Sequence, residues 1–253
     1  MKLFPFFWET KKCTDLLASV QEERKDLLVD DIQDADMILA WGWDGWMLHA
    51  MRQYSDHNLP FFGLHCGTLW FLTNKDCLSC IEQLASQEIE LITIHSLDTT
   101  LVDSWWTHIE WFARNDLVVW GNVFDYSHFA ISTDMQMQVS GTWLVISTAL
   151  WSTAYAANLG TPIIPLHSTL WSISGIATGE YKYSFVSPDD QDIDIDIQSR
   201  SLVSVALDGY NTIHHNIKKI QLRPGTHTAR LAFLSSEQFA ERRLLLAEKK
   251  LGR

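Results

Sequence analysis

A short apolar run that ends in a glycine turn constrains the fold of this chain more than any other feature. Residues 37–40 (Met-Ile-Leu-Ala) are continuously apolar, which is typical of a buried parallel strand. The segment from Gly42 to Gly45 interrupts this run, and residues 47–54 can form a helix. A strand, a tight glycine turn and a helix in this order favour an α/β domain.

The first 90 residues continue this alternation. Residues 12–28 place apolar side chains at helical spacing among charged ones and predict an amphipathic helix. Residues 60–64 predict a second strand, and a helical stretch follows around residues 75–87. We therefore expect an α/β domain over residues 1–92.

Beyond residue 92 the pattern changes to short, closely spaced β-rich segments, such as residues 117–119 and 144–146. At residues 192–197 aspartate and isoleucine alternate, so the isoleucines can face a core and the aspartates water. A calcium loop there would need a glycine and a closing glutamate, which are missing. We expect a mostly antiparallel β-rich domain over residues 93–234 and a charged helix over residues 235–253.

Composition limits the possible functions. The formal net charge is −12, from 31 acidic and 19 basic side chains, which argues against a general role on nucleic acid or anionic membrane. The N-terminus lacks a signal-peptide pattern, and no run approaches 18 apolar residues, so we expect a cytoplasmic protein with no membrane partner.

Cysteine and histidine spacing predicts no metal site. The pair at Cys77 and Cys80 has no second pair at zinc-ribbon spacing, so we expect reduced thiols on a short helix. The histidines, His49 and the pair at residues 214–215 among them, show no metal-ligand spacing.

Five segments carry the candidate chemistry, in one order along the chain. They are Gly-Trp-Asp-Gly-Trp-Met-Leu at residues 42–48, Gly-Leu-His-Cys-Gly-Thr-Leu-Trp-Phe-Leu-Thr at 63–73, Ala-Arg-Asn-Asp-Leu at 113–117, Ser-Thr-Ala-Leu-Trp-Ser-Thr-Ala-Tyr at 147–155, and Leu-Asp-Gly at 207–209. They resemble, in family order, the Gly-Gly-Asp-Gly-Thr-x-Leu, Gly-x-Asn-x-Gly, Ala-Leu-Asn-Asp/Glu, Ser-Thr-Pro-Thr-Gly-Ser-Thr-Ala-Tyr and late Asp-Gly motifs of the NAD kinases.

The resemblance implies a Rossmann-like N-terminal domain, a sandwich-like C-terminal domain and a last helix that returns to the first domain. It also implies transfer of the γ-phosphoryl group of ATP, or of polyphosphate, to the 2′-hydroxyl of the adenosine ribose of NAD, which gives NADP. Mg²⁺ would accompany ATP. NAD kinases are commonly homodimers or homotetramers, so the resemblance implies a homo-oligomer here.

The resemblance also assigns roles to individual residues. Asp44 would be the general base for the 2′-hydroxyl. The residues that would bind the dinucleotide and its phosphates are Gly42, Gly45, Gly63, Gly67, Asn115, Asp116, Ser152, Thr153, Ala154, Tyr155 and Asp208. Among these, Asn115 and Asp116 would hold ribose hydroxyls, and residues 152–155 would surround the adenine and its ribose. His65 stands where the family often has asparagine.

Each assignment has a structural alternative. Asp44 could cap the helix that begins near Met47. Asn115 with Asp116 could form an ordinary turn, and Asp208 with the glycine after it an ordinary hairpin. Tyr155 alone would usually belong to a core.

Tryptophan occupies positions where the family has glycine. Trp43, Trp70, Trp143 and Trp151 are such positions, and an indole there would fill the phosphate loop and disturb the fold. The chain has 12 tryptophans beside only 12 glycines. We hypothesise that the motif tryptophans, with Trp46, stand for UGA codons that the source organism reads as glycine. UGG codons at these positions would exclude this hypothesis.

Other interpretations remain open. Thr142 stands where the family usually has aspartate, and recoding does not explain this. Lipid kinases of the diacylglycerol kinase type share the first glycine loop, although the motifs at residues 115–116 and 152–155 favour NAD kinase. A non-catalytic dinucleotide-binding protein with a tryptophan-blocked phosphate site is the third possibility.

Overall fold

The chain divides into two compact units in a computed structural model. The first contains residues 1–94 and 228–253, and the second residues 95–227. The structure describes residues 1–66, 71–74, 78–86, 89–122, 124–134, 136–153, 155–176, 183–209, 213–234 and 245. All but one residue of the predicted C-terminal helix therefore lie outside the described residues. Within the described part of the chain, no helix is long and apolar enough to cross a membrane.

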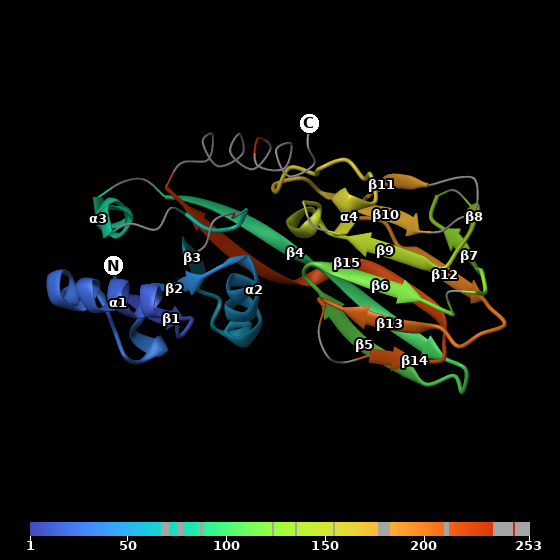
Figure 1. Cartoon of the computed structure of the whole chain (residues 1–253), viewed down its shortest axis with the longest axis horizontal. Helices are drawn as coiled ribbons and strands as arrows, with labels where there is room; N and C mark the ends of the chain where they lie inside the picture. The colour runs from blue at the N-terminus through green and yellow to red at the C-terminus, as the bar shows by residue number, and fades with distance from the viewer. Residues whose placement is uncertain are drawn as a thin grey trace. The chain divides into compact units, whose positions relative to one another are not determined.

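The first unit is built on a parallel sheet. Its strands run in the order β1 (Leu3–Phe7), β2 (Met37–Gly42), β3 (Pro60–His65) and the C-terminal end of β15 (Ile217–Phe233) (Figure 1). All residues of β2 and β3 are buried, as their apolar sequences predict. The predicted strands at residues 37–40 and 60–64 are thus confirmed.

Among the described residues of this unit there are three α-helices: α1 (Lys11–Glu23), α2 (Asp44–Gln53) and α3 (Leu78–Ser86). Short 3-10 helices follow α1 and α2, at η1 (Lys25–Leu27), η2 (Ile32–Asp34) and η3 (Ser55–His57). Thr10 caps α1, because its side chain accepts a hydrogen bond from the Cys13 N–H group. α2 begins at Asp44, three residues earlier than predicted, so the glycine turn forms the first turn of the helix.

The second unit consists of antiparallel strands. One sheet contains β8 (Gln136–Gly141), β7 (Ser127–Ser132), β12 (Ile193–Gln198), β15, β4 (Glu90–Asp103) and β5 (His108–Ala113). The other runs in the order β11 (Ser184–Pro188), β10 (Leu170–Ile176), β9 (Trp143–Ser147), β6 (Asp116–Trp120), β13 (Ser204–Leu207) and β14 (Ile213–His215) (Figure 1). Between β9 and β10 lie η4 (Ala149–Trp151) and α4 (Tyr155–Asn158).

One apolar core joins the two sheets of the second unit. Phe129 and Ile195 of one sheet and Leu144 and Val205 of the other belong to the same buried cluster, which is the arrangement of a β-sandwich. On β12 the isoleucines are buried and the aspartates are not, as their alternation predicts. The predicted class, an α/β unit followed by a sandwich-like β unit, is confirmed.

The turn between β4 and β5 has an unusual residue in its left-handed position. Trp106 has a φ of 65°, a conformation that strongly favours glycine over bulky residues. Its side chain is 81% exposed, and that of Trp105 is 71% exposed. The Asp103 carboxylate holds the turn by accepting the N–H groups of Trp105 and Thr107, each at 2.8 Å. Position 106 lies outside the five motifs, and its backbone conformation still favours glycine. This agrees with the hypothesis that some tryptophans of this chain stand for encoded glycines.

We expect Trp106→Gly to stabilise the chain, because it removes the left-handed strain of an L-residue, about 1 kcal/mol, and little packing. The midpoint of thermal unfolding should rise by roughly 2–4 °C. Trp105→Gly is the matched control: Trp105 is similarly exposed, but its φ is not in the left-handed region. Equal shifts for the two variants would contradict this explanation.

Candidate functional site

Asp44 is fixed at the start of α2 by the segment that follows β3. Its Oδ2 atom accepts the Phe71 N–H group at 2.8 Å, and its Oδ1 atom accepts the Leu72 N–H group at 3.0 Å. The residue before it, Trp43, is the N-cap and offers no side-chain cap. The carboxylate therefore connects the first and second motifs, so its interactions go beyond those of the predicted helix cap.

The Trp43 indole lies over the first turn of α2. A Cβ atom added to Gly45 would lie 2.7 Å from the Trp43 Nε1 atom, so the ring occupies the space beside the Gly45 backbone. The first N–H groups of a helix have no partner within the helix and are the usual place for a phosphate. Tryptophan at position 43 thus fills the volume that a glycine would leave open to an anion.

The backbone at Trp43 does not itself require glycine. Its φ of −115° and ψ of 177° are extended values, which any residue adopts. The expected disturbance of the fold is therefore not seen here, because strand, turn and helix all form with the indole in place. The obstacle at position 43 is the volume of the side chain.

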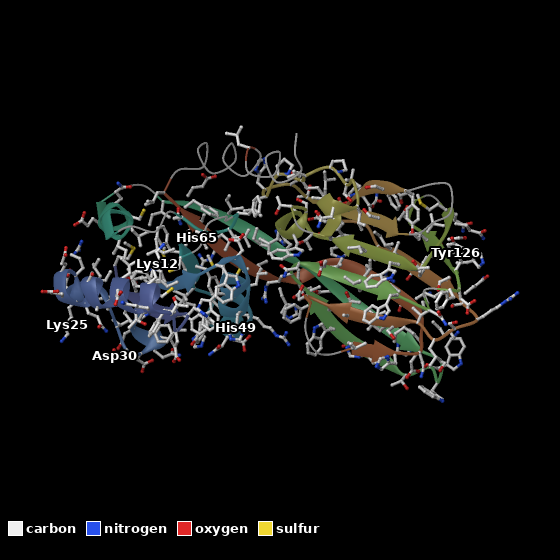
Figure 2. All side chains as sticks on the ribbon, viewed as in Figure 1. Lys12, Lys25, Asp30, His49, His65 and Tyr126 are labelled. Atoms are coloured by element: carbon white, nitrogen blue, oxygen red, sulfur yellow. The ribbon has the colours of Figure 1, made fainter. Side chains whose placement is uncertain are left out.

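An aromatic cluster surrounds this turn. Trp46 stacks on Phe6, with ring centroids 4.5 Å apart and ring planes at 4°, and its Nε1 atom donates to the Phe6 carbonyl. Trp8 makes edge contacts with Trp43 at 4.6 Å and with Trp46 at 4.9 Å. His49 of α2 lies 5.0 Å from the Trp46 ring and is labelled in Figure 2. The cluster completes the cover over the turn.

The second motif begins at the end of β3. A Cβ atom on Gly63 would lie 2.6 Å from Thr73 Cγ2 and 2.7 Å from Met47 Cε, so glycine is required by packing at this position. His65 is buried at the end of the same strand (Figure 2). Gly67, also predicted to bind the dinucleotide, lies outside the described residues.

In the second unit, Asp208 joins the third and fifth motifs. Its carboxylate accepts the Arg114 N–H group at 3.0 and 3.1 Å and the Asn115 N–H group at 2.7 Å. Its own N–H group donates to the Asp116 carbonyl at 2.8 Å. β13 and β14 pair antiparallel, so the predicted hairpin is present, and Asp208 and Gly209, both with positive φ values, begin its connection. Asp208 therefore has two roles: its backbone forms part of the turn, and its carboxylate binds the Arg114 and Asn115 N–H groups.

Asn115 presents an oxygen to which no described residue donates. The side chain is 5% exposed, and its Oδ1 atom is buried without a hydrogen-bond partner among the described residues. Its backbone is held in place, because the Asn115 carbonyl accepts the Thr148 N–H group at 2.8 Å. A buried, rigidly held acceptor of this kind fits a hydroxyl group of a ligand.

The neighbouring carboxyl group is easily protonated. Burial, and to a smaller extent the nearby Asp208 carboxylate, together raise the pKa of Asp116 from 3.8 to about 7. Burial also raises the pKa of Asp208, although the N–H groups of Asn115 and Arg114 and the Arg114 charge oppose this. Near neutral pH the two carboxyl groups therefore share less than two negative charges.

The Asp116 proton predicts a pH-dependent stability. Between about pH 4 and pH 7 the folded chain holds this proton and the unfolded chain does not, so the free energy of unfolding falls as pH rises through this range. The fall should be a few kcal/mol and end near pH 7. In urea unfolding, Asp116→Asn should remove most of this dependence on pH. Asp196→Asn, at an exposed position, should leave the dependence unchanged. Equal slopes in the original chain and in Asp116→Asn would contradict the prediction.

The fourth motif forms η4 and the residues after it. Ser152 is completely buried, and its hydroxyl accepts the Ile164 N–H group at 3.0 Å and lies 3.0 Å from the Ala149 carbonyl. Thr153 is buried beside it. Ala154 lies outside the described residues, as does the side chain of Tyr155, whose backbone begins α4. Ser152 thus holds together the segment that carries the other predicted binding residues.

The other described motif tryptophans fit their surroundings. Trp143 pairs with Trp120 across β9 and β6, and the two rings stack at 5.8 Å. Trp151 is half-buried at the end of η4. Thr142 is buried, and its carbonyl accepts the Gly121 N–H group. Trp70 lies outside the described residues.

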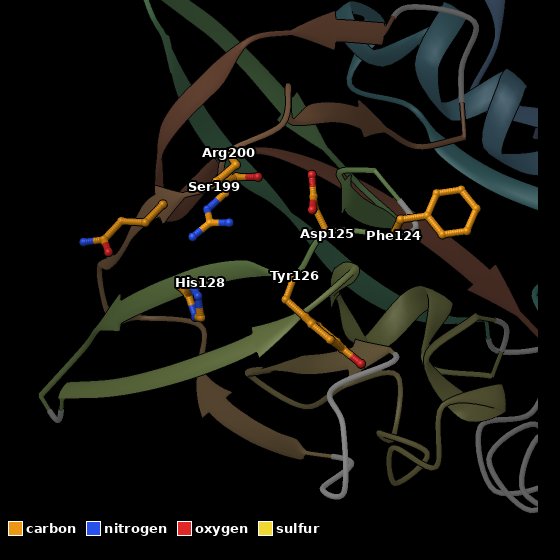
Figure 3. Close-up of a pocket in the computed structure, with 7 residues that line it drawn as sticks. Phe124, Asp125, Tyr126, His128, Ser199 and Arg200 are labelled. Atoms are coloured by element: carbon orange, nitrogen blue, oxygen red, sulfur yellow. The ribbon is translucent and has the colours of Figure 1, made fainter.

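A cavity of about 480 Å³ in the second unit contains none of the predicted site residues (Figure 3). It is lined by Phe124, Asp125, Tyr126, His128, Gln198, Ser199 and Arg200. Two of its polar side chains already have protein partners, since Asp125 accepts from Ser201 and His128 Nδ1 contacts Ser140 Oγ. It is therefore a weaker candidate than the motif residues.

Sequence reasoning missed two contributors to the site. Thr148 donates its hydroxyl to the Arg114 carbonyl at 2.5 Å and so fixes the Asn115 segment. The buried Arg114 guanidinium lies 4.9 Å from the Phe112 ring centroid, and its charge acts to lower the pKa of Asp208. A basic residue where the family has leucine was the available signal for Arg114.

Sequence comparison connects these motifs to known proteins. No protein-family model matches the chain. An NAD kinase of Methanosphaera stadtmanae is 33% identical over 137 residues, which cover 52% of this chain and 48% of the relative. The chain spans between 48% and 64% of the length of four curated NAD kinases that it matches, this one included.

Solved structures share the fold over almost the whole chain. The yeast NADH kinase complexed with NADH matches with a TM-score of 0.80 at 15% identity, over 99% of this chain and 87% of that protein. An NAD kinase from Archaeoglobus fulgidus in complex with ATP matches with a TM-score of 0.74 at 17% identity, over 98% and 99% of the two chains. The chain is therefore similar in sequence to NAD kinases over about half of its length and shares the fold of NAD and NADH kinases over almost all of it.

Proposed function

We propose that the chain phosphorylates the 2′-hydroxyl of the adenosine ribose of NAD, with ATP or polyphosphate as the donor, and releases NADP. The observation that carries this proposal is the position of Asp44. Asp44 lies at the N-terminus of a helix that follows a buried parallel strand. The backbone N–H groups of Phe71 and Leu72, from the segment after β3, orient its carboxylate. This places a base beside the part of the fold that is suited to phosphate.

In this mechanism Asp44 accepts the proton of the 2′-hydroxyl as that oxygen attacks the γ-phosphorus atom. A bond from the ribose oxygen to phosphorus forms, the bond from phosphorus to the β-phosphate oxygen breaks, and ADP leaves. The proton then passes from Asp44 to water. The Phe71 and Leu72 N–H groups orient the two oxygens of the carboxylate that receives this proton.

Binding of the dinucleotide is assigned to the second unit. The buried Asn115 Oδ1 atom accepts a ribose hydroxyl, and Asp116 and Asp208 complete the polar group around it. Thr153, Ala154 and Tyr155 surround the adenine and its ribose, while Ser152 holds their segment. Gly42, Gly45 and Gly67 would give the phosphates access to the backbone of the first unit, whereas Gly63 supports the site through its packing against Thr73 and Met47.

Mg²⁺ enters as the complex with ATP. No group of three or more His, Cys, Asp or Glu side chains among the described residues could hold a metal ion. Phosphate oxygens and water would be the main ligands of the ion that accompanies ATP, as is common for Mg²⁺. Its chemistry is neutralisation of phosphate charge during transfer.

The Trp43 geometry favours a second candidate, a dinucleotide-binding relative that does not transfer phosphate. The indole over Gly45 occupies the space that a phosphate needs. A coupled assay of NADP formation from NAD, ATP and Mg²⁺ separates the two candidates when it is combined with direct measurement of NAD binding. The assay uses the original chain and a glycine-restored chain, in which glycine replaces Trp43, Trp46, Trp70, Trp143 and Trp151. Binding of NAD without NADP formation in both chains would support the second candidate.

We also infer that two or four copies assemble, and the molar mass in solution tests this. The lipid-kinase alternative is not favoured by the comparisons. It predicts phosphorylation of diacylglycerol in the same assay format.

A further inference from the structure

Two cysteines that are far apart in the sequence meet in the first unit. Cys13 lies in the first turn of α1, and Cys66 directly follows β3. Their Sγ atoms are 2.7 Å apart, and no disulfide joins them. Cys13 is completely buried and Cys66 is half-buried, so a small reagent reaches the pair from the Cys66 side.

Both thiols are carried by well-held backbone. The Cys13 N–H group donates to the Thr10 Oγ1 atom at the helix cap. The Cys66 N–H group donates to the Gly42 carbonyl at 2.8 Å, which ties it to the end of β2. The contact between the sulfur atoms is therefore a consequence of the sheet and the helix, and bond formation requires little movement of the backbone.

We propose that Cys13 and Cys66 are a redox modification site that forms a reversible disulfide. The oxidant is a hydroperoxide. The Cys66 thiolate attacks a peroxide oxygen, the O–O bond breaks, and a sulfenic acid and one water form when hydrogen peroxide is used. The Cys13 thiolate then attacks the Cys66 sulfur, the S–O bond breaks, and the disulfide and a second water form. A small dithiol reverses the reaction.

The position of this bond gives it a consequence for the site. Cys66 precedes Gly67 and is bonded through its backbone to Gly42, so it lies between two segments predicted to bind phosphate or dinucleotide. A disulfide would tie these segments to the start of α1. This part of the inference rests on the proposed function. It predicts that oxidation weakens NAD binding, with about a tenfold rise in KM, or 1.4 kcal/mol.

The test uses the full chain, reduced and then treated with hydrogen peroxide. Digestion and mass spectrometry should find a peptide pair that joins Cys13 to Cys66, two hydrogen atoms lighter than the free peptides, and dithiothreitol should separate it. Cys80→Ser is the matched control, because Cys80 is also buried, and it should keep the cross-link. A bond from Cys66 to Cys77 or Cys80, or oxidation of Cys66 to a sulfinic acid without a bond, would overturn the proposal.

The unfolding temperature and the assay add two further measurements. Oxidation should raise the unfolding temperature of the original chain and leave that of Cys13→Ser unchanged. In the glycine-restored chain, oxidation should raise the KM for NAD, and Cys13→Ser should abolish this response. If the reduced glycine-restored chain forms no NADP, the proposed function fails, while the peptide mass still decides whether the disulfide forms.

Discussion

A variant with glycine in place of Trp43, Trp46, Trp70, Trp143 and Trp151 is expected to form NADP from NAD, ATP and Mg²⁺ at least about 100-fold faster than the tryptophan chain. Such a change corresponds to about 2.7 kcal/mol of transition-state stabilisation. The physical reason is steric. The indole of Trp43 occupies the space beside Gly45 at the first turn of α2, where the phosphates would approach the N–H groups.

Single substitutions show how much of this rise in rate each position contributes. Trp43→Gly should recover the largest part, because it uncovers the turn directly. A double Trp105→Gly, Trp106→Gly variant is the matched control, since it makes the same exchange in an exposed hairpin of the second unit and should leave the rate unchanged. A folded, glycine-restored chain that forms no NADP would contradict the kinase proposal. UGG codons at the motif positions would exclude recoding but not the steric argument.

Much of the fold could be predicted because local signals agreed with the final structure. The continuous apolar runs of β2 and β3 indicate strands that are buried on both faces. The alternation of β12 indicates a strand that is buried on one face only. β15 was missed because its sequence contains several charged residues, Pro224 and Gly225. Gly225 is explained only by tertiary structure, since a Cβ atom there would collide with the Ser96 backbone on β4.

The candidate site was predicted through motif order, and its contacts were not. Nothing in the local sequence indicates that Asp44 binds the N–H groups of Phe71 and Leu72. The bond from Asp208 to the Asn115 backbone joins residues 93 positions apart. The contact between Cys13 and Cys66 is of the same kind. Such pairs depend on the packing of whole elements, which a single sequence does not specify.

Asp44→Asn in the glycine-restored chain is expected to lower kcat by roughly 100-fold to 10,000-fold, which is the usual contribution of a general base. An amide side chain has nearly the same shape as the carboxylate but cannot take the proton of the 2′-hydroxyl. The KM for NAD should change little, because the residues assigned to the dinucleotide belong mainly to the second unit. The measurement is the initial rate of NADP formation over a range of NAD concentrations.

Loss of stability must be separated from loss of the base. Asparagine has one oxygen where aspartate has two, so one of the N–H groups of Phe71 and Leu72 loses its acceptor, at a cost of about 1–3 kcal/mol. Met51→Ala is a suitable control, because it removes a completely buried side chain from the same helix and costs about 2–5 kcal/mol. Below its unfolding temperature this control should keep most of its activity. If Asp44→Asn loses no more activity than Met51→Ala, Asp44 is a structural residue that joins two motifs, and the base must be sought elsewhere.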